Sequence, residues 1–458
     1  MRSWKLWFWI GAAAAFAGSA PGGGLDRDAV VEKHILPIIE ADLIESAVVG
    51  IALDGEVSYH PIGTLGDGSG AAPTKDTLYE IGSISKVITG VFFADAVRRG
   101  EVVRDTPIDD LLPEGVDAPD IDGVEVTLEH LATHTSGWPT APVNLRPSDP
   151  ARPFKGYTED RMYRYADQAL PGSTPGTTHE YSNYGYGLLG TLIARRVGDA
   201  YEALVTRRVL EPLGIEDMMI TLGEGAPARL APPMSEGRPS ANWETMGPMD
   251  PAGMWVADAE AVLNFIRANL RHGDEPIHRS LEISRTTLLE GGGGMPPMRW
   301  GWFVGGDGDS LWHNGGTGGY ASFSAINTLR NAAVVVLANG TTPLVTRAGD
   351  NIFHELLGVE RSPVEIDRSD RVDAEAAAPL VGTYRSGFGH ELIVTHEVGR
   401  LFARLKGQAS LKIVPTGEPR RYRYTGVEAE LAFAEPEGGA SPAVTLYQNG
   451  YEIECERV

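Results

Sequence analysis

The sequence predicts an α+β protein in which helices flank an antiparallel sheet, followed by a small C-terminal all-β domain. Three observations carry this prediction. Turn-linked β-rich runs occur near residue 47 and again near residue 310, helix-like runs dominate the region between them, and short alternating strands fill the chain from about residue 376. Strands that gather at both ends of a helical region favour one antiparallel sheet covered by helices.

Composition and charge limit the classes of function. The chain has 458 residues, of which 42% are hydrophobic and 22% charged, as in ordinary soluble globular proteins. The formal net charge of −23 opposes binding to a phosphate backbone, so we expect no nucleic-acid partner. Cys455 is the only cysteine, which rules out an intrachain disulfide and a thiolate metal cluster.

The N-terminal segment has the pattern of an export signal. Arg2 and Lys5 form a short basic region, an apolar run follows, and small residues offer cleavage after Ala17 or Ala20. The apolar run is shorter than the ~20 residues that a membrane-spanning helix needs. We therefore predict a signal peptide over residues 1–20, an exported, periplasmic protein and no stable membrane span. An uncleaved anchor is the alternative.

The predicted catalytic domain covers residues 26–358. Its first helix lies in residues 26–44, where apolar residues have helical spacing, and Pro37 is expected to break it. Two β-rich runs then flank Asp54-Gly55, which is a strong signal for a hairpin over residues 47–63.

Helices and long loops are predicted in the middle of this domain. Residues 86–100 predict a mostly buried helix with arginines in its last turn and a glycine at its end. Residues 127–137 predict a short helix with Thr127 as its N-cap. Residues 139–176 and 223–251 are rich in proline, glycine and serine, and predict long surface loops.

The remaining chain is rich in predicted strands. Residues 310–340 predict three strands joined by a glycine-rich turn and a second polar turn. A polar linker is expected over residues 359–375. Residues 376–458 alternate in short runs and predict a small all-β domain, either a barrel or a sandwich.

Ser83 precedes Lys86 by three residues at the start of a helix-like run. A serine at such a place is most often an N-cap, whose oxygen accepts a hydrogen bond from a backbone N–H. However, Lys86 is the only lysine with a serine three positions earlier, and this spacing puts both side chains on one helix face. Burial lowers the pKa of a lysine, and a neutral amine can take a proton from a serine nucleophile. This motif alone leaves both interpretations open.

Two further motifs offer polar groups. Tyr181 and Asn183 are two residues apart, so an extended turn would project both side chains to one side. A tyrosine beside a lysine can relay a proton, and an asparagine can hold a substrate amide. His313 ends an apolar strand, and Gly315 and Gly316 would let a substrate backbone approach closely. A polar turn and a glycine-rich hairpin are the alternatives without chemistry.

Other patterns are less specific. The glycines of "GYGLLG" at residues 185–190 have the spacing of a dinucleotide-binding loop, but no apolar strand precedes them, so close helix packing is favoured. His130 and His134 lie four apart on a predicted helix. No glutamate follows His130 and no further ligand cluster is present, so we expect no metal. The G-x-S-x-G motif of α/β hydrolases is absent.

In the order S-x-x-K, Y-x-N and H-x-G, the three motifs resemble those of the serine β-lactamases of class C and the related DD-peptidases, D-aminopeptidases and esterases. The resemblance covers about residues 30 to 357 and includes the blocks "YEIGSISK", "TLEHLATHTSGWP", "PGTTHEYSNYGYGLLG", "EPLGIEDM", "MDPAGMWVADAEAVLNF" and "WHNGGTGGYASF". It implies the β-lactamase/transpeptidase-like fold. Residues from about 376 onward resemble the lipocalin-like β domain appended to some relatives, which implies a barrel.

The resemblance also implies catalytic roles. Ser83 would be the acylated nucleophile, and Lys86 and Tyr181 would share the proton transfers. The backbone N–H groups of Ser83 and Gly316 would form the oxyanion hole. Neither a metal nor another cofactor is implied.

The same resemblance implies substrate contacts and one departure. Asn183 would contact the substrate amide, while His313 and Gly315 would line the strand side of the pocket. Class C β-lactamases carry K-T-G where this chain has His313-Asn314-Gly315, and a histidine there resembles a group of DD-peptidases and other penicillin-recognising hydrolases. The loss of a fixed positive charge should weaken recognition of a β-lactam carboxylate.

The leading expectation is an acyl-serine hydrolase of the class C type that acts on a β-lactam or related amide, with a small molecule or a peptide as its substrate. The first alternative is a D-alanyl-D-alanine carboxypeptidase, a D-aminopeptidase or an esterase with the same residues. The second alternative is a ligand-binding protein that uses the fold without turnover. Intact Ser83, Lys86 and Tyr181 argue against that second alternative.

Overall fold

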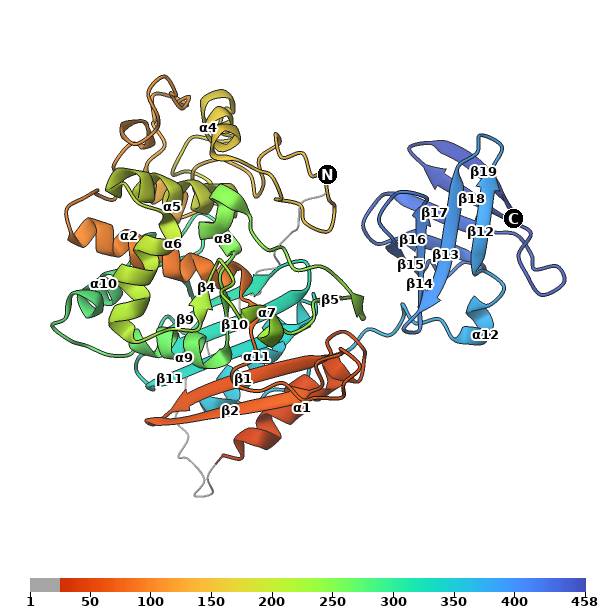
Figure 1. The fold of residues 1–458 in the computed structure, drawn as a ribbon, viewed down its shortest axis with the longest axis horizontal. Coiled ribbons are helices and arrows are strands. Elements are labelled where there is room, and N and C mark those ends of the chain that lie inside the picture. Colours follow the sequence, from red (N-terminus) through yellow and green to blue (C-terminus); the bar gives the residue numbers. More distant parts are fainter. Residues whose placement is uncertain (1–24) are drawn as a thin grey trace. The chain divides into compact units, whose positions relative to one another are not determined.

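The chain divides into two compact units between Val364 and Glu365 (Figure 1). The structure is a computed structural model that describes residues 25–458, so the predicted signal peptide lies outside the described residues. The division falls inside the segment that the sequence marks as a linker. The predicted α+β class is confirmed, because the first unit combines a sheet with helices and the second is built mainly of strands.

A six-stranded antiparallel sheet, with the order β2-β1-β11-β10-β9-β8, forms the centre of the first unit. The hairpin near the start of the unit therefore pairs with the strands near its end. The strands are β1 (Ser46–Leu53), β2 (Glu56–Gly63), β8 (Phe303–Val304), β9 (Ser310–Gly316), β10 (Tyr320–Asn327) and β11 (Ala332–Asn339).

Local signals fix the hairpin. Asp54 and Gly55 both have positive φ, 54° and 86°, as a two-residue turn between β1 and β2 requires. The predicted hairpin and the three predicted strands of residues 310–340 are confirmed.

Helices cover both faces of the sheet. Helix α9 (Ala259–Ala268) packs on β1 and β11, and α11 (Leu344–Leu356) packs on β10 and β11 together with α1 (Arg27–Ile39). Val335 and Leu337 of β11 belong to the same core as α9, and the residues that alternate with them point to the other face. Helix α1 continues through Pro37 and ends two residues later, close to the predicted break.

The region between β2 and β8 contains most of the helices. The predicted buried helix is α2, and nearly all its residues are buried, since it packs against α5, α8 and α10. The longer helices here are α2 (Ser85–Arg98), α4 (Glu159–Gln168), α5 (Asn183–Val197) and α10 (Pro276–Ser284). The shorter ones are α3 (Leu128–Ala132), α6 (Tyr201–Val205), α7 (Ala226–Arg229) and α8 (Asp250–Gly253). Short strands β3 (Tyr79–Glu80), β7 (Val256–Ala257) and β4 (Met218–Met219) form a small sheet in that order, and β5 (Met234–Ser235) pairs with β6 (Arg238–Pro239).

The prediction of long surface loops over residues 139–176 and 223–251 is wrong in part. The first segment contains helix α4, and the second contains α7, the β5–β6 pair and α8. Helix α4 buries only Met162, Tyr163, Tyr165 and Ala166 along one stripe. The surrounding prolines and glycines dominate the composition of the window and hide this short amphipathic pattern.

Close helix packing explains the glycines of residues 185–190. A Cβ atom at Gly187 would lie 2.8 Å from the sulfur of Met249, and one at Gly190 would collide with the ring of Pro251 on α8. The preference for packing over a dinucleotide loop is therefore supported by direct contact between α5 and α8.

The second unit is a closed barrel of eight antiparallel strands, and β12 pairs with β19 to close it. The strands are β12 (Gly382–Ser386), β13 (Glu391–Glu397), β14 (Arg400–Leu405), β15 (Leu411–Pro415), β16 (Arg421–Tyr424), β17 (Ala429–Phe433), β18 (Ala443–Gln448) and β19 (Tyr451–Arg457). Helix α12 (Ala374–Ala377) precedes them. Inward side chains such as Leu392, Leu401 and Leu431 pack into one cluster, so the barrel's own residues fill its interior.

The α5–α8 contact yields a stability prediction. Gly190→Ala should lower the free energy of unfolding by about 1–3 kcal/mol, because the added methyl group forces α8 away from α5. Arg196→Ala, on an exposed position of the same helix, is the control and should change stability by less than about 0.5 kcal/mol. Denaturant unfolding measures both values, and equal values would contradict the packing argument.

Candidate active site

Ser83 lies at the junction between strand β3 and helix α2. It is the middle residue of a 3-10 turn, η1 (Gly82–Ile84), that leads directly into α2. Ser83 caps neither helix: the N-cap residues are Ile81 and Ile84, and neither makes a side-chain capping bond. The Ser83 hydroxyl lies next to the Lys86 side chain instead. Ser83 is therefore not a helix N-cap.

Lys86 is fully buried, and its ammonium nitrogen lies among three oxygens. Nζ is 3.0 Å from Ser83 Oγ, 2.7 Å from Asn183 Oδ1 and 2.6 Å from the carbonyl oxygen of Ala252. Within the described part of the chain no carboxylate pairs with Nζ, and burial holds the pKa of Lys86 well below its usual range. The neutral amine is therefore favoured far more than in water.

Tyr181 approaches the same serine from the loop before α5. Its side chain forms a hydrogen bond with Ser83, and Lys86 Nζ lies 4.8 Å from the centre of its ring. Burial raises the pKa of the Tyr181 phenol, while the bond to Ser83 lowers it. The phenol is therefore protonated at neutral pH and can donate or relay a proton.

Asn183 begins helix α5, next to the N-cap Ser182. Its side-chain oxygen accepts a hydrogen bond from Lys86, so the amide helps to fix the amine. Tyr181 thus contacts Ser83, and Asn183 contacts Lys86. Their spacing of two residues predicts that both side chains lie on the same side.

His313 lies on β9 and is 1% exposed. Burial and the neighbouring charge of Lys86 lower the pKa of His313 to about 3, so the ring is neutral at physiological pH. Its Nδ1 lies 2.6 Å from the Asn314 carbonyl oxygen, and its ring lies 5.2 Å from that of Phe303 and 6.4 Å from that of Tyr181. The strand position where the resemblance to class C enzymes implies a lysine therefore carries a neutral ring.

Gly315 and Gly316 occupy different environments at the end of β9. A side chain at Gly315 would collide with the carbonyl oxygen of Ile81 and with Ser322, so this glycine allows β9 to approach the segment before Ser83. A Cβ atom at Gly316 would meet only the Tyr320 carbonyl oxygen, at 3.9 Å. The open space at this strand end therefore lies beside Gly316.

The backbone nitrogen of Gly316 lies close to the nucleophile segment. A Cβ atom at Gly82, the residue before Ser83, would collide with that nitrogen, and Gly82 has a φ of 54°. The structure thus brings together Ser83, Lys86, Tyr181, Asn183, His313 and the Gly315–Gly316 strand end, from η1, α2, the loop before α5, and β9.

Two contacts escaped the sequence reasoning. The Ala252 carbonyl accepts a bond from Lys86, and a backbone oxygen leaves no trace in a residue pattern. His134 packs 4.4 Å from the Tyr181 ring, although its spacing from His130 drew attention only as a possible metal pair. The placement of both histidines on one helix is wrong, because α3 ends at Ala132 and His134 has a φ of 58°. Among the residues that the structure describes, no group of histidine, cysteine and acidic side chains could hold a metal ion.

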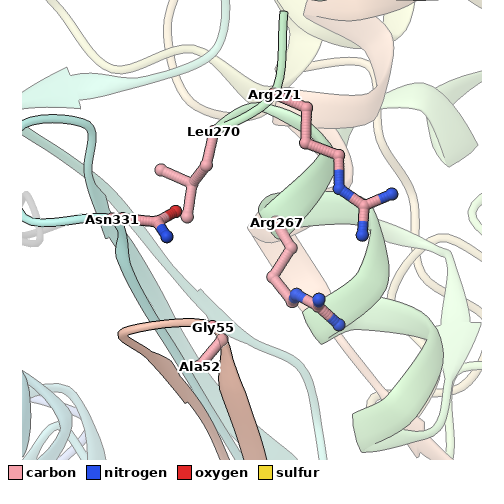
Figure 2. Close-up of a pocket in the computed structure, with 6 residues that line it drawn as sticks. All are labelled: Ala52, Gly55, Arg267, Leu270, Arg271 and Asn331. Carbon is pink, nitrogen blue, oxygen red and sulfur yellow. The ribbon is translucent and has the colours of Figure 1, made fainter.

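A shallow pocket of about 170 Å³ lies elsewhere, at the turn ends of the sheet. Figure 2 shows Leu270 and Asn331 on one side of it, with the guanidinium groups of Arg267 and Arg271 pointing away from Asn331. The other lining residues are Ala52 and Gly55. None of these residues belongs to the Ser83 site.

Comparisons with known proteins indicate the family and the fold. The Beta-lactamase family model matches residues 13–358. A beta-lactamase of Escherichia coli (strain K12) is 28% identical over 263 residues, which are 57% of this chain and 64% of that relative. Penicillin-binding protein 4 of Amycolatopsis lactamdurans is 27% identical over 78% of this chain and 95% of its own length.

A solved structure shows the same fold. The beta-lactamase/D-alanine carboxypeptidase from Yersinia pestis is 21% identical and covers 72% of this chain and 98% of its own, with a TM-score of 0.62. The family model spans most of the catalytic unit and the whole set of site residues. The chain therefore belongs to the Beta-lactamase family of serine hydrolases.

Proposed function

We propose that this protein hydrolyses an amide or ester bond through a covalent acyl-enzyme on Ser83. The observation that carries the proposal is the contact of 3.0 Å between Ser83 Oγ and a buried lysine without a carboxylate partner among the described residues. A neutral amine at that distance can accept the serine proton as the hydroxyl oxygen attacks a carbonyl carbon.

Each step has a group in reach. The Ser83 oxygen forms a bond to the carbonyl carbon, and its proton passes to the Lys86–Tyr181 pair. The same pair returns the proton to the leaving nitrogen or oxygen as that bond breaks. Water then attacks the acyl-enzyme, which releases the acid and restores the Ser83 hydroxyl. The backbone N–H groups of Ser83 and Gly316 would stabilise the oxyanion in both steps, and Asn183 would contact the substrate amide.

The leading substrate class is a β-lactam or a related amide. The names of the relatives, beta-lactamase and penicillin-binding protein, support this class. His313 favours the second candidate, a D-alanyl-D-alanine carboxypeptidase, D-aminopeptidase or esterase. Its ring is buried and neutral, so it cannot supply the fixed charge that holds a β-lactam carboxylate.

We also infer that the protein is exported to the periplasm, on the basis of the basic and apolar pattern of residues 1–20. The helices of residues 25–458 include none with the length and apolar character that crossing a bilayer demands. Partners beyond a small-molecule or peptide substrate are not implied by the site.

Labelling of Ser83 tests the proposed chemistry. Wild type should form a covalent adduct with a labelled penicillin, whereas Ser83→Ala should form none and lose turnover by at least about a thousandfold. Ser69→Ala, at an exposed serine of the same unit, is the control and should behave like wild type. Mass spectrometry of the intact protein and a chromogenic cephalosporin measure the two effects.

The outcomes separate the candidates. Fast cephalosporin turnover supports a β-lactamase, a stable adduct without turnover supports a peptidase, and hydrolysis of short esters alone supports an esterase. Identical behaviour of wild type and Ser83→Ala on every substrate would show that the protein does not use this serine.

The pH dependence tests the role of Lys86. Because only the neutral amine accepts a proton, kcat/KM should fall as pH is lowered through the depressed pKa of Lys86. His313, with a pKa of about 3, is already neutral there, so His313→Asn should leave the position of this acidic limb unchanged. Rate profiles between about pH 5 and pH 9 measure the limb. If His313→Asn shifts the acidic limb to another pH, the limb reports the ionisation of His313 and not that of Lys86.

A further inference from the structure

His134 stands out because it is buried beside the site and the proposed mechanism does not use it. Its side chain is 1% exposed, and its backbone has a φ of 58°, just beyond the end of α3. This left-handed conformation turns the chain back toward the loop that carries Tyr181. Histidine, asparagine and aspartate adopt it more readily than most residues.

Both backbone amides beside Tyr181 bond to this one residue. The Glu180 N–H donates to the His134 carbonyl oxygen at 2.8 Å, and the Ser182 N–H donates to His134 Nδ1 at 3.0 Å. The N–H groups of the two residues next to Tyr181 in the chain are therefore both held by His134. Since Ser182 is also the N-cap of α5, this arrangement ties the loop to the helix start.

The imidazole also packs against the Tyr181 ring. The two ring centres are 4.4 Å apart with an angle of 36° between the planes, and the Tyr186 ring lies 4.9 Å away on α5. Tyr186 is itself anchored, because its hydroxyl donates to the Ala132 carbonyl oxygen at 2.8 Å. The His134 ring thus packs against the anchored Tyr186 ring and also contacts the Tyr181 ring.

The protonation state of His134 suits this arrangement. Burial, with smaller contributions from His179, Lys86 and His313, holds its pKa well below the usual range, so the ring is neutral. Because Nδ1 accepts the Ser182 N–H, the proton is on Nε2, which is buried and has no hydrogen-bond partner. The unpaired Nε2–H has an energetic cost. In return, Nδ1 is fixed as a hydrogen-bond acceptor next to Tyr181.

We propose that His134 is a positioning residue that fixes the Tyr181 hydroxyl against Ser83, by holding the N–H groups of Glu180 and Ser182 and by stacking on the phenol ring. This inference rests on the proposed function. It assigns the histidine to proton transfer through Tyr181 and not to a metal. A misplacement of about 1 Å in a reacting group can cost roughly a hundredfold in rate.

Two substitutions separate the amide contact from the ring contact. His134→Phe keeps a flat ring and removes the acceptor of the Ser182 N–H. His134→Asn keeps an acceptor oxygen near the place of Nδ1, tolerates the left-handed backbone, and removes the ring. His130→Ala is the control: it removes the acceptor of the Thr127 N–H from a half-buried histidine that lies away from the Ser83 site.

In steady-state assays, His134→Phe should lower kcat by about 10- to 100-fold with KM within about threefold of wild type. His134→Asn should retain at least about five times the kcat of His134→Phe, which is rescue by the acceptor alone. His130→Ala should lose thermal stability without losing kcat. The proposal is overturned if His134→Phe retains full kcat, or if the losses in the two His134 variants simply follow their losses in stability.

A second readout does not require turnover. The titratable groups close to the Tyr181 ring include Lys86, His134, His313 and Tyr186. Removal of the imidazole in His134→Asn should admit water to the Tyr181 phenol and so lower its pKa. Tyrosinate absorbance should then show one tyrosine that ionises at lower pH than in wild type. This ionisation should be absent from the double variant that also carries Tyr181→Phe. If this ionisation does not appear, the stacking role is wrong. If it appears while Ser83→Ala equals wild type in every assay, only the proposed function fails.

Discussion

The burial of Lys86 is the constraint on which the rest of the catalytic unit depends. A fully buried lysine is costly as an ammonium ion, and without a carboxylate partner among the described residues the neutral amine is favoured. Three oxygens from three different segments surround the nitrogen, at 2.6–3.0 Å. Any element that moves would leave a buried polar atom unpaired, so α2, α5 and α8 are energetically coupled at this one atom.

The helix contacts make that coupling possible. The α8 segment can offer its Ala252 carbonyl only because α5 has glycines where Met249 and Pro251 lie against it. On the opposite side, Gly315 lets β9 approach the segment before Ser83. The packing of small residues therefore sets the distances between the polar groups, and the hydrogen bonds between these groups stabilise that packing.

The sequence predicts those parts of the fold and the site that have a local signal. Asp54-Gly55 specifies a turn by backbone conformation alone, and Ser83, Lys86, Tyr181 and Asn183 lie in motifs whose order resembles that of a known family. Helix α4 was hidden because ten helical residues lie within a long run of loop-forming composition. The Ala252 carbonyl could not be predicted, since every residue has one and only the tertiary fold selects it. The spacing between His130 and His134 gives no sign of the left-handed backbone that places His134 beside Tyr181.

The closure of the C-terminal barrel has a consequence for association. Every strand from β12 to β19 pairs with a neighbour on each side, so no strand of the barrel wall is an edge strand. An open sheet exposes unpaired N–H and C=O groups along its edge, and these invite strand addition and aggregation. The eight strands that the structure describes offer no such edge. A protein that recognises this domain must therefore do so through side chains and loops and not by extending its sheet.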